Sequence, residues 1–372
     1  MVASQCYADG FCTSFAKEGD FLNFIKERGE NSIWKRMKTS KLKVKAIDEM
    51  QNDLSIRPSV WADTLKNTRL VLETEDGDYP VRDCAIKTML ERSRISGNAL
   101  SKVKKEVFAE IINHCLGVAK GEALIKIADE KVSALHGGDE SDYAVLEITE
   151  LFSTLIEYLE KNFPDYEYEA GSYDHSLVTS IWSFPKSMKL VDTYKNLLIK
   201  RGISFEKIVP ALRFSTSDAG ISGANLYPML VINGKRAIAL GNPLKVDHKN
   251  KATIADFRKN LDLVYAKYLN AMAELSRLLT IDIEYPLNTM MRVMKAIGIT
   301  KKSAIKALKL FKDQNGEASC TAHDLFLAIN EVVFSLECEG ASASKIVQTE
   351  ESVARALKIN WEEYDYPDDF KW

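Results

Sequence analysis

A polar loop near the middle of the chain combines residue types that could bind an anion or transfer a proton. Residues 215–220 read Ser-Thr-Ser-Asp-Ala-Gly and offer hydroxyl groups, one carboxylate and the backbone amides of a glycine-containing turn. Successive amides in such a turn can form a concave anion-binding site. No Gly-Lys-Ser or Gly-Lys-Thr follows, so the loop is not a nucleotide-binding loop of the Walker A type. We therefore predict a polar ligand site formed by Ser215, Ser217, Asp218 and Gly220.

His248 is the second residue in this part of the chain whose chemistry could support a function. With Asp218 it could form a general acid–base pair. Polar residues at such a separation are also expected from loop caps, so we predict a non-enzymatic protein with no catalytic residues and no cofactor. Three other histidines, His114, His175 and His323, are expected at core-boundary, capping or surface positions.

The cysteines do not indicate a metal site. The chain has six cysteines but no Cys-x-x-Cys pair, and no histidine lies at zinc-finger spacing from two of them. Most of them lie in apolar or helical surroundings, as buried thiols do. We predict reduced cysteines and no bound metal.

Hydrophobic patterns place the polar loop in a region of strands. Asn233-Gly234 separates two apolar runs, which is a strong signal for a hairpin with a type I′ turn. A second strand pair is predicted on either side of Asp129-Glu130. Strand patterns concentrate at about 69–240, and helical patterns dominate after 250. Since strands do not alternate regularly with crossover helices, we predict an α+β fold with a mostly antiparallel sheet region followed by a helical C-terminal region.

The same patterns divide the chain into four predicted segments. Thr253 and Thr300 precede apolar-periodic runs and are predicted to cap helices. The segments are a helical and basic N-terminal extension (1–66), an α+β core domain (67–250), a helical domain (251–360) and an acidic, aromatic tail (361–372).

The length and composition are those of an ordinary globular protein. The 372 residues include 46% hydrophobic and 28% charged residues, with a net charge of −3. The sequence has no apolar run of the length that a membrane helix needs, and its N-terminus lacks the pattern of a secretory signal. We expect the protein in the cytoplasm of the host cell, without a membrane partner.

Basic residues cluster in separate segments although the net charge is slightly negative. One cluster surrounds the Asn233-Gly234 hairpin and the loop after it, and another lies on a later helix. Acidic residues concentrate at 139–169 and in the tail. This separation is compatible with one positive face for a phosphate backbone, although lysine-rich helix faces are also common as solvated surfaces. We predict nucleic-acid contacts by Lys235, Arg236, Lys245, His248, Lys249, Lys251, Lys301, Lys302, Lys306 and Lys309.

Aromatic residues accompany some of the basic residues. Trp34 precedes Lys35, and Tyr265 and Tyr268 flank Lys267. Base stacking on aromatic rings, combined with lysine contacts to phosphate, holds single strands without sequence preference. The alternative is that these aromatic residues belong to the core.

The tail is similar in kind to the acidic, aromatic-ended tails of single-stranded DNA-binding proteins. Such a tethered tail competes with DNA for a basic groove and docks on partner proteins. We predict that partners contact Trp361, Asp368, Asp369, Phe370 and Trp372. The alternative is a terminal packing element in which Trp361 and Phe370 are buried.

The order of elements over about 70–350 resembles a phage and plasmid protein family known as domain of unknown function 932. That family often has a cysteine before the Asn-Gly of the hairpin, where this chain has Ile232. The resemblance implies a protein of a mobile genetic element and no established chemistry. Three segments carry it: Tyr79-Pro80-Val81-Arg82-Asp83-Cys84-Ala85 before a helix, Ser141-Asp142-Tyr143 between a strand pair and a helix, and 213–257 with Ser217, Asp218 and His248.

Together these observations predict a phage- or plasmid-encoded, non-enzymatic protein that binds single-stranded DNA and assists annealing, as a homo-oligomeric ring or filament. An alternative is a host-interaction protein whose acidic stretch, 139–169, imitates DNA and inhibits a bacterial defence enzyme. A third interpretation is a structural component of the virion.

Overall fold

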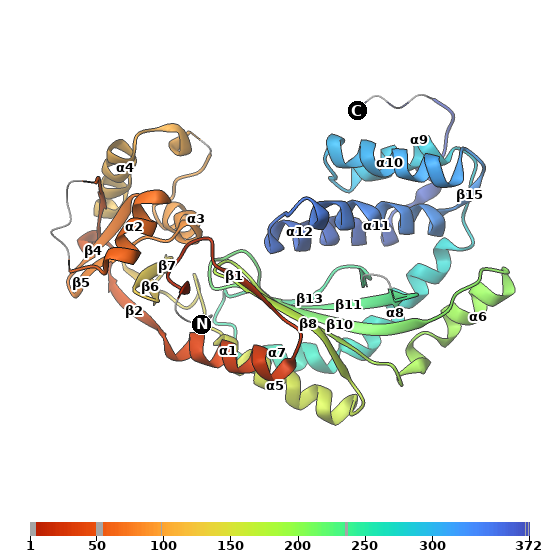
Figure 1. Cartoon of the computed structure of the whole chain (residues 1–372), viewed down its shortest axis with the longest axis horizontal. Helices are drawn as coiled ribbons and strands as arrows, with labels where there is room; N and C mark the ends of the chain where they lie inside the picture. The colour runs from red at the N-terminus through yellow and green to blue at the C-terminus, as the bar shows by residue number, and fades with distance from the viewer. Residues whose placement is uncertain (1–4, 50–54, 98, 235–236, 369, 371) are drawn as a thin grey trace.

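A long antiparallel sheet forms the centre of the molecule (Figure 1). The computed structural model describes residues 5–49, 55–97, 99–234, 237–368, 370 and 372. Within these ranges the sheet has seven strands in the order β1-β8-β9-β10-β11-β12, and β13 pairs with another part of β11. Their bounds are β1 Cys12–Phe15, β8 Glu167–Asp174, β9 Val178–Ser183, β10 Ile208–Thr216, β11 Ala224–Ile232, β12 Ile238–Ala239 and β13 Leu244–Val246.

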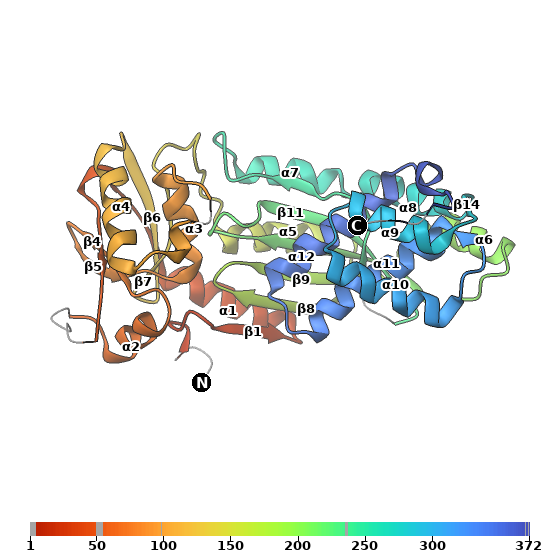
Figure 2. The ribbon, with the colours of Figure 1, turned by 90° about the horizontal axis from the view of Figure 1, so that it is seen from above.

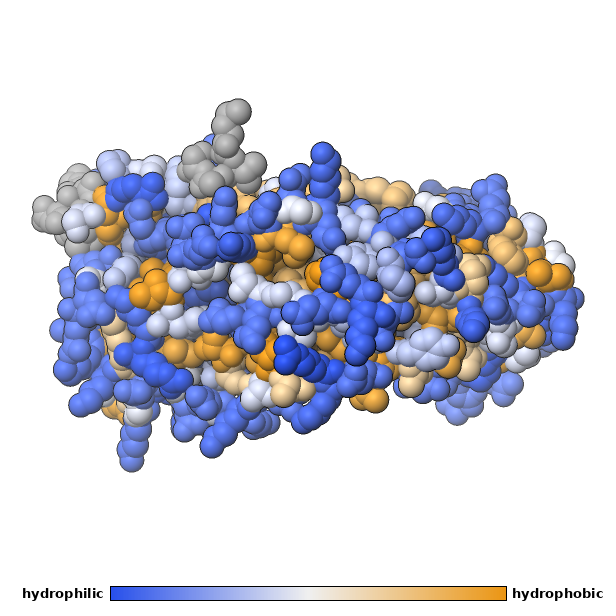
Figure 3. Space-filling model, turned by 90° about the horizontal axis from the view of Figure 1, so that it is seen from below, coloured by the Kyte–Doolittle hydropathy of each residue, from blue (hydrophilic) through white to orange (hydrophobic). Residues whose placement is uncertain are grey.

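Helices cover one face of this sheet and are drawn beneath it in Figure 1. Alternate strand residues point down into the core, where the Phe152 ring contacts Phe214 at 4.9 Å and Phe21 at 5.0 Å between centroids. Seen from below, hydrophilic side chains surround smaller apolar groups on the outer face (Figure 3). The helices are α1 Glu18–Glu30, α5 Ile148–Asn162, α7 Ile254–Asp262 and α8 Val264–Leu278.

The described residues between 32 and 138 form a lobe with its own core, here called the N-lobe, at the left of Figure 1. Its two small antiparallel sheets have the orders β2-β6-β7 and β3-β4-β5. The predicted turn of the β6–β7 hairpin is confirmed, since Asp129 and Glu130 both have positive φ, 49° and 66°. The elements are β2 Ser32–Lys38, β3 Lys43–Ala46, α2 Pro58–Lys66, β4 Leu70–Thr74, β5 Gly77–Pro80, α3 Asp83–Arg92, α4 Lys105–Val118, β6 Glu122–Ala128 and β7 Lys131–Gly137.

Residues 282–354 form a layer of helices above the other end of the sheet, here called the helical layer (Figures 1 and 2). Its apolar side chains belong to the same core cluster as those of the sheet. Thr253 and Thr300 accept hydrogen bonds from Asp256 N and Ser303 N, so both predicted caps are confirmed. The layer contains α9 Pro286–Ala296, α10 Lys301–Asn315, α11 Ala322–Cys338 and α12 Ala343–Ala354, with β14 Asp282–Ile283 paired to β15 Cys320–Thr321.

Short elements connect these parts. Helix α6, Asp192–Lys200, lies near the sheet end at the right of Figure 1. Single 3₁₀ turns occupy Thr39–Lys41, Leu100–Lys102, Met188–Leu190, Arg355–Lys358 and Trp361–Tyr364. In the described part of the chain, no helix combines the length and the apolarity that crossing a membrane requires.

The predicted α+β class is confirmed, with antiparallel sheets early in the chain and helices at its end. The two cores divide the chain differently from the predicted segments: the N-lobe core includes both Leu42 and Leu135, whereas sheet and helical layer share one core. Residues 35–45, assigned to a helical extension, lie largely in β2 and β3. Their alternation of exposed lysines with inward residues is the two-residue period of a strand.

Candidate functional site

A cavity of about 600 Å³ lies where the N-lobe meets the sheet, and we call it the junction cavity. Helix α3, the end of β7, and the loops around 141–143, 220–223 and 245–249 line it. Its basic lining residues are Lys87, Arg92, Arg94, Lys245 and Lys249. The acidic residues of the described lining are fewer: Glu91, Asp142 and Asp247. The cavity is therefore locally basic in a protein whose net charge is −3.

The basic side chains differ in how firmly they are held. The Arg92 guanidinium donates to Lys120 O at 2.8 Å and Glu122 O at 3.0 Å, and burial lowers its pKa. Lys87 donates to Gly220 O at 2.7 Å, which ties α3 to the loop after β10. Arg94 and Lys249 are exposed. The side chains of Arg94 and Lys249 can therefore contact a ligand that enters from solvent.

Three stacked rings form one wall of the cavity. Tyr143 lies parallel to His136 and His248, with centroid distances of 3.7 and 5.2 Å and interplanar angles of 6°. All three residues are buried. Burial lowers the pKa of His136 to about 4 and also lowers the pKa of His248, while it raises the pKa of Tyr143. Both imidazoles are therefore neutral near pH 7, and the wall is uncharged.

The loop predicted as a ligand site packs behind this wall. The Asp218 carboxylate pairs with Lys126 of β6, and Asp218 O lies 2.7 Å from His136 Nε2. The amides of Ala219 and Ile221 donate to the Ser217 hydroxyl at 3.1 and 3.3 Å. Two amides of the expected anion site are therefore already paired. Of the predicted residues, Gly220 lines the junction cavity, while Ser215 is a buried residue of β10.

The structure brings His248 close to this loop but not into a hydrogen bond with Asp218. His248 Nε2 lies 3.3 Å from the Thr216 hydroxyl, and its Nδ1 lies 3.2 Å from Ala144 O. The Ala144 amide donates back to His248 O at 3.1 Å. His248 thus joins two loops of the cavity wall.

The predicted basic residues separate into two groups. Lys245, His248 and Lys249 line the junction cavity, and the Lys251 amide donates to Glu140 O in the neighbouring loop. Lys301, Lys302, Lys306 and Lys309 lie on α10 of the helical layer, where Lys306 pairs with Glu339. Figure 1 places α10 far from the N-lobe. Lys235 and Arg236 lie outside the described residues.

The aromatic residues expected beside the lysines also differ in position. Tyr268 is buried, and its hydroxyl donates to Met229 O, so it is a core residue. Trp34 packs 5.6 Å from Tyr143 behind the cavity wall. Tyr265 is 45% exposed, on α8.

The tail folds back on the helical layer, and of the two residues that the alternative interpretation expected to be buried, Trp361 is buried and Phe370 is half-buried. Trp361 is fully buried and donates from its indole to Ala356 O at 2.9 Å, so it does not act as an exposed anchor. The Asp365 carboxylate accepts the amides of Glu284 and Tyr285 at the start of α9. The Arg292 guanidinium lies 3.3 Å from the Tyr366 ring centroid and donates to backbone carbonyls of the tail, including that of Asp368.

The end of the tail is only partly described. Lys295 lies over the Phe370 ring at 5.1 Å, and the Phe370 and Trp372 rings are 5.8 Å apart. Asp369 lies outside the described residues. In the described tail the Asp365 carboxylate is therefore held at the start of α9, while Arg292 is bound by backbone carbonyls.

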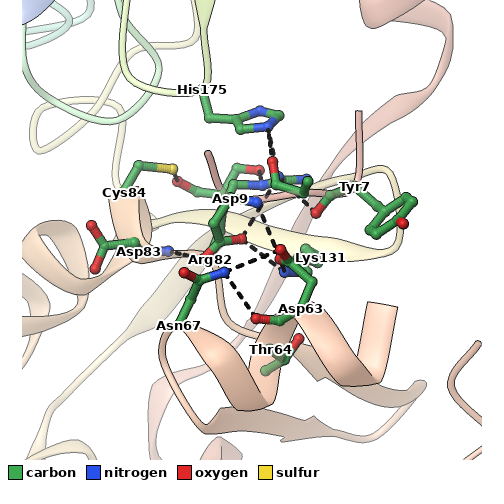
Figure 4. A network of polar contacts seen from close by, with 12 residues as sticks. Tyr7, Asp9, Asp63, Thr64, Asn67, Arg82, Asp83, Cys84, Lys131 and His175 are labelled. Atoms are coloured by element: carbon green, nitrogen blue, oxygen red, sulfur yellow. Dashed lines mark hydrogen bonds and ion pairs between the residues drawn. The ribbon is translucent and has the colours of Figure 1, made fainter. Parts of the chain in front are cut away.

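A buried polar network fastens the N-terminal segment between the N-lobe and the sheet (Figure 4). Arg82 donates to the carbonyls of Cys6 at 3.3 Å and Tyr7 at 3.2 Å, and lies 2.7 Å from His175 Nε2 after β8. Lys131 pairs with Asp9 at 2.8 Å and with Asp63. Arg82 and Lys131 are fully buried. We call these contacts the Arg82 network, and they position the lobe that forms one side of the cavity.

Sequence reasoning missed His136, the basic residues Lys87 and Arg92 of α3, and Arg94 in the turn after it. Lys87 and Glu91 recur at helical spacing, which indicates a shared helix face but not what that face meets. Only the packing of α3 beside the loop at 220 brings them to Lys249.

No protein-family description matches this chain, and no curated protein or solved structure shows significant similarity to it. The resemblance to domain of unknown function 932 therefore stays a prediction. The chain is an α+β protein with a basic cavity between the N-lobe and the central sheet.

Proposed function

We propose that this protein binds single-stranded nucleic acid and holds backbone phosphates at the junction cavity. The observation that carries the proposal is the charge of the cavity, with five basic and three acidic residues in its described lining. A volume of about 600 Å³ lies within the range of about 300–1,000 Å³ that is usual for ligand sites. Exposed lysine and arginine side chains are the groups that bind phosphates through charge.

The neutral wall supports the same proposal. Because His136 and His248 are uncharged near pH 7, binding depends on the lysine and arginine residues. These side chains make a sequence-independent contact, since phosphates carry no base information. The proposed annealing role would use this property, because it requires binding to strands of any sequence.

The test is binding of a fluorescent oligothymidylate to the full chain at low salt, followed by anisotropy. The variant Arg94→Glu/Lys249→Glu is expected to weaken binding at least tenfold. Each lost phosphate contact should also reduce the slope of log K against log salt by about 0.7. The matched control, Lys301→Glu/Lys302→Glu on α10, makes the same change in net charge and should bind as the unmodified chain does.

Two results would count against the proposal. Absence of binding by the unmodified chain at low salt removes the function. Loss of binding in the α10 variant alone moves the interface to the helical layer and removes the cavity from it.

A second candidate function rests on the outer face of α5. Glu150, Glu157 and Glu160 are exposed and recur at helical spacing, as on a surface that contacts a basic groove. This arrangement supports the alternative of a host-interaction protein. A bacterial partner captured by the unmodified chain, but not by a Glu150→Lys/Glu157→Lys variant, would favour it over nucleic-acid binding.

A further inference from the structure

The outer face of α8 lacks the charges that a helix usually turns to water. This helix lies beneath the sheet, and its inner face belongs to the main core (Figure 1). The exposed residues between 265 and 273 are Tyr265, Ala266, Leu269, Asn270 and Ala273. They follow the spacing of one helix face, and none of them is charged. Helix α8 is therefore largely apolar on two sides, although the core requires only one.

The neighbouring helices show the usual pattern. Helix α7 exposes Arg258 and Lys259, and α5 exposes Glu157 and Glu160. A surface helix normally combines an apolar stripe toward the core with a charged or polar face toward solvent. The uncharged face is thus a feature of α8 and not of this whole side of the molecule.

Large apolar side chains gather at the start of α8. Leu263 is 51% exposed, Tyr265 45% and Leu269 42%. In the described chain no other stretch of seven residues exposes more than two large hydrophobic side chains. Such a concentration is typical of a surface that contacts another molecule. We call Leu263 and the exposed residues of 265–273 the α8 patch.

A hollow of about 380 Å³ adjoins the α8 patch, between α5, α8 and the 3₁₀ turn at Met188–Leu190. Tyr158 and Phe163 line it, with their ring centroids 6.2 Å apart, and Tyr265 lines it from α8. The same corner of the molecule therefore carries both exposed apolar side chains and a partly aromatic hollow.

The charged residues that line this hollow are of both signs. Lys186 pairs with Asp165 at 2.7 Å. Lys189 and Asp262 are exposed, and neither forms an ion pair with a described residue. One positive and one negative side chain are thus left to contact a partner.

A surface with these properties fits a second copy of the same chain. In a two-fold dimer one patch faces itself, so it must carry both members of every complementary pair. Here the apolar side chains lie beside a hollow, and Lys189 lies beside Asp262. A phosphate backbone would meet no lysine or arginine among the residues of the α8 patch, so nucleic acid fits it poorly.

We propose that the α8 patch forms a two-fold interface between two copies of this chain. Leu263 and Leu269 pack on the hollow of the partner, and Asp262 pairs with Lys189 of the partner subunit. None of these residues lines the junction cavity, so the interface does not depend on nucleic-acid binding.

Sedimentation equilibrium of the full chain tests the interface in the absence of nucleic acid. The unmodified chain is expected to show a monomer–dimer equilibrium. Leu269→Glu places a charge on the apolar face and should raise the Kd of the dimer at least tenfold. The matched control is Ile305→Glu on α10, because Ile305 is 49% exposed and the change in net charge is the same.

Charge reversal tests the pairing of Asp262 with Lys189. Lys189→Glu and Asp262→Lys should each raise the Kd of the dimer at least threefold. The double variant should restore it, because the two charges have then exchanged places. A monomer at every concentration, a dimer that Leu269→Glu leaves intact, or a double variant that binds no tighter than the single variants would overturn the proposal.

Nucleic-acid binding separates this proposal from the proposed function. Oligothymidylate should still bind to Leu269→Glu, because the junction cavity is unchanged. Failure of the dimer would leave that binding in place, and failure of nucleic-acid binding would leave the dimer in place. A Leu269→Glu variant that loses oligothymidylate binding but keeps the dimer would make the α8 patch a nucleic-acid contact and overturn the interface.

Discussion

The N-lobe and the helical layer are attached to the same sheet in two different ways. The N-lobe has its own core and meets the sheet mainly through polar contacts: the Arg82 network, the Lys126–Asp218 pair and the bond from Lys87 to Gly220 O. The helical layer instead shares one apolar core with the sheet. A polar boundary can border a charged cavity, whereas a boundary within one core excludes water and makes two layers one cooperative unit.

The contrast is not absolute. Helix α12 rests on the open face of the sheet through Val347 and Ala354, but it also carries Glu350, which pairs with Arg213. The Arg213 guanidinium lies 4.3 Å from the Tyr227 ring centroid. One buried ion pair within apolar packing fixes the position of α12 without dividing the core.

The largest expected effect is that of Arg82→Met, which removes the centre of the Arg82 network. The carbonyls of Cys6 and Tyr7 would lose a buried donor. Breaking a buried charged contact from one side costs about 3–5 kcal/mol. We expect urea unfolding to separate into two transitions, with the N-lobe unfolding first.

The control for this variant is Arg94→Met at the exposed rim of the cavity, which should change the free energy of unfolding by less than about 0.5 kcal/mol. A single transition with an unchanged midpoint in Arg82→Met would show that the polar contacts do not fasten the lobe.

Leu325→Ala tests the apolar boundary. Leu325 is fully buried on α11, and truncation of such a residue leaves a cavity that costs about 3 kcal/mol. Because the core is shared, we expect a single transition and faster amide hydrogen exchange in β10 as well as in α11. Leu310→Ala, at a surface position of α10, is the matched control. Unchanged exchange in β10 would mean that the helical layer unfolds independently.

The junction should also respond to pH through His136. Burial lowers the pKa of His136 from 6.5 to about 4, next to Asp218, His248 and Lys87. The unfolded chain therefore binds the proton more readily, and this contribution to stability, complete above pH 6.5, is lost as pH falls toward 4. Between pH 7 and pH 5 the free energy of unfolding should fall by about 2 kcal/mol more in the unmodified chain than in His136→Gln.

Urea titrations at the two pH values measure this difference. His114→Gln is the control, because the His114 side chain is 81% exposed on α4. If the stability of the unmodified chain and that of His136→Gln depended on pH in the same way, the result would contradict the buried environment assigned to His136.

The smallest effect is expected for Lys306→Ala on the surface of the helical layer. Lys306 and Glu339 are 44% and 42% exposed, and such pairs contribute about 0–1 kcal/mol. The midpoint temperature of thermal unfolding should change very little. A loss of stability as large as that caused by Arg82→Met would show that burial does not determine how much a charged residue contributes to stability.

Local features of the fold were predictable where short sequence motifs dictate backbone geometry. Asn233 and Gly234 have the positive φ values, 54° and 66°, that their turn requires. Thr253 caps α7 because its hydroxyl meets an amide three residues later, which needs no distant partner. Residues 35–45 were misassigned because their lysines were interpreted as a basic extension and not as the exposed side of strands.

The candidate site was predictable only in part, because it depends on contacts between residues that are far apart in the sequence. Lys245 of β13 is followed within four residues by His248 and Lys249, but the α3 residues that complete the cavity are far away in the sequence. His323 was expected at a capping or surface position and is buried against Tyr194, since α6 packs on that side of its helix. Charge patterns alone also could not show that Arg292 and Lys295 would hold the tail.

The sequence by itself determined the local elements: the turns at Asp129 and Asn233, the capped helices and the α+β class, because these depend on neighbours along the chain. Only the tertiary structure decided which charged residues face one another. Electrostatic interactions depend on distance and burial in space, and folding places Lys131 in the interior while it leaves Lys249 in water.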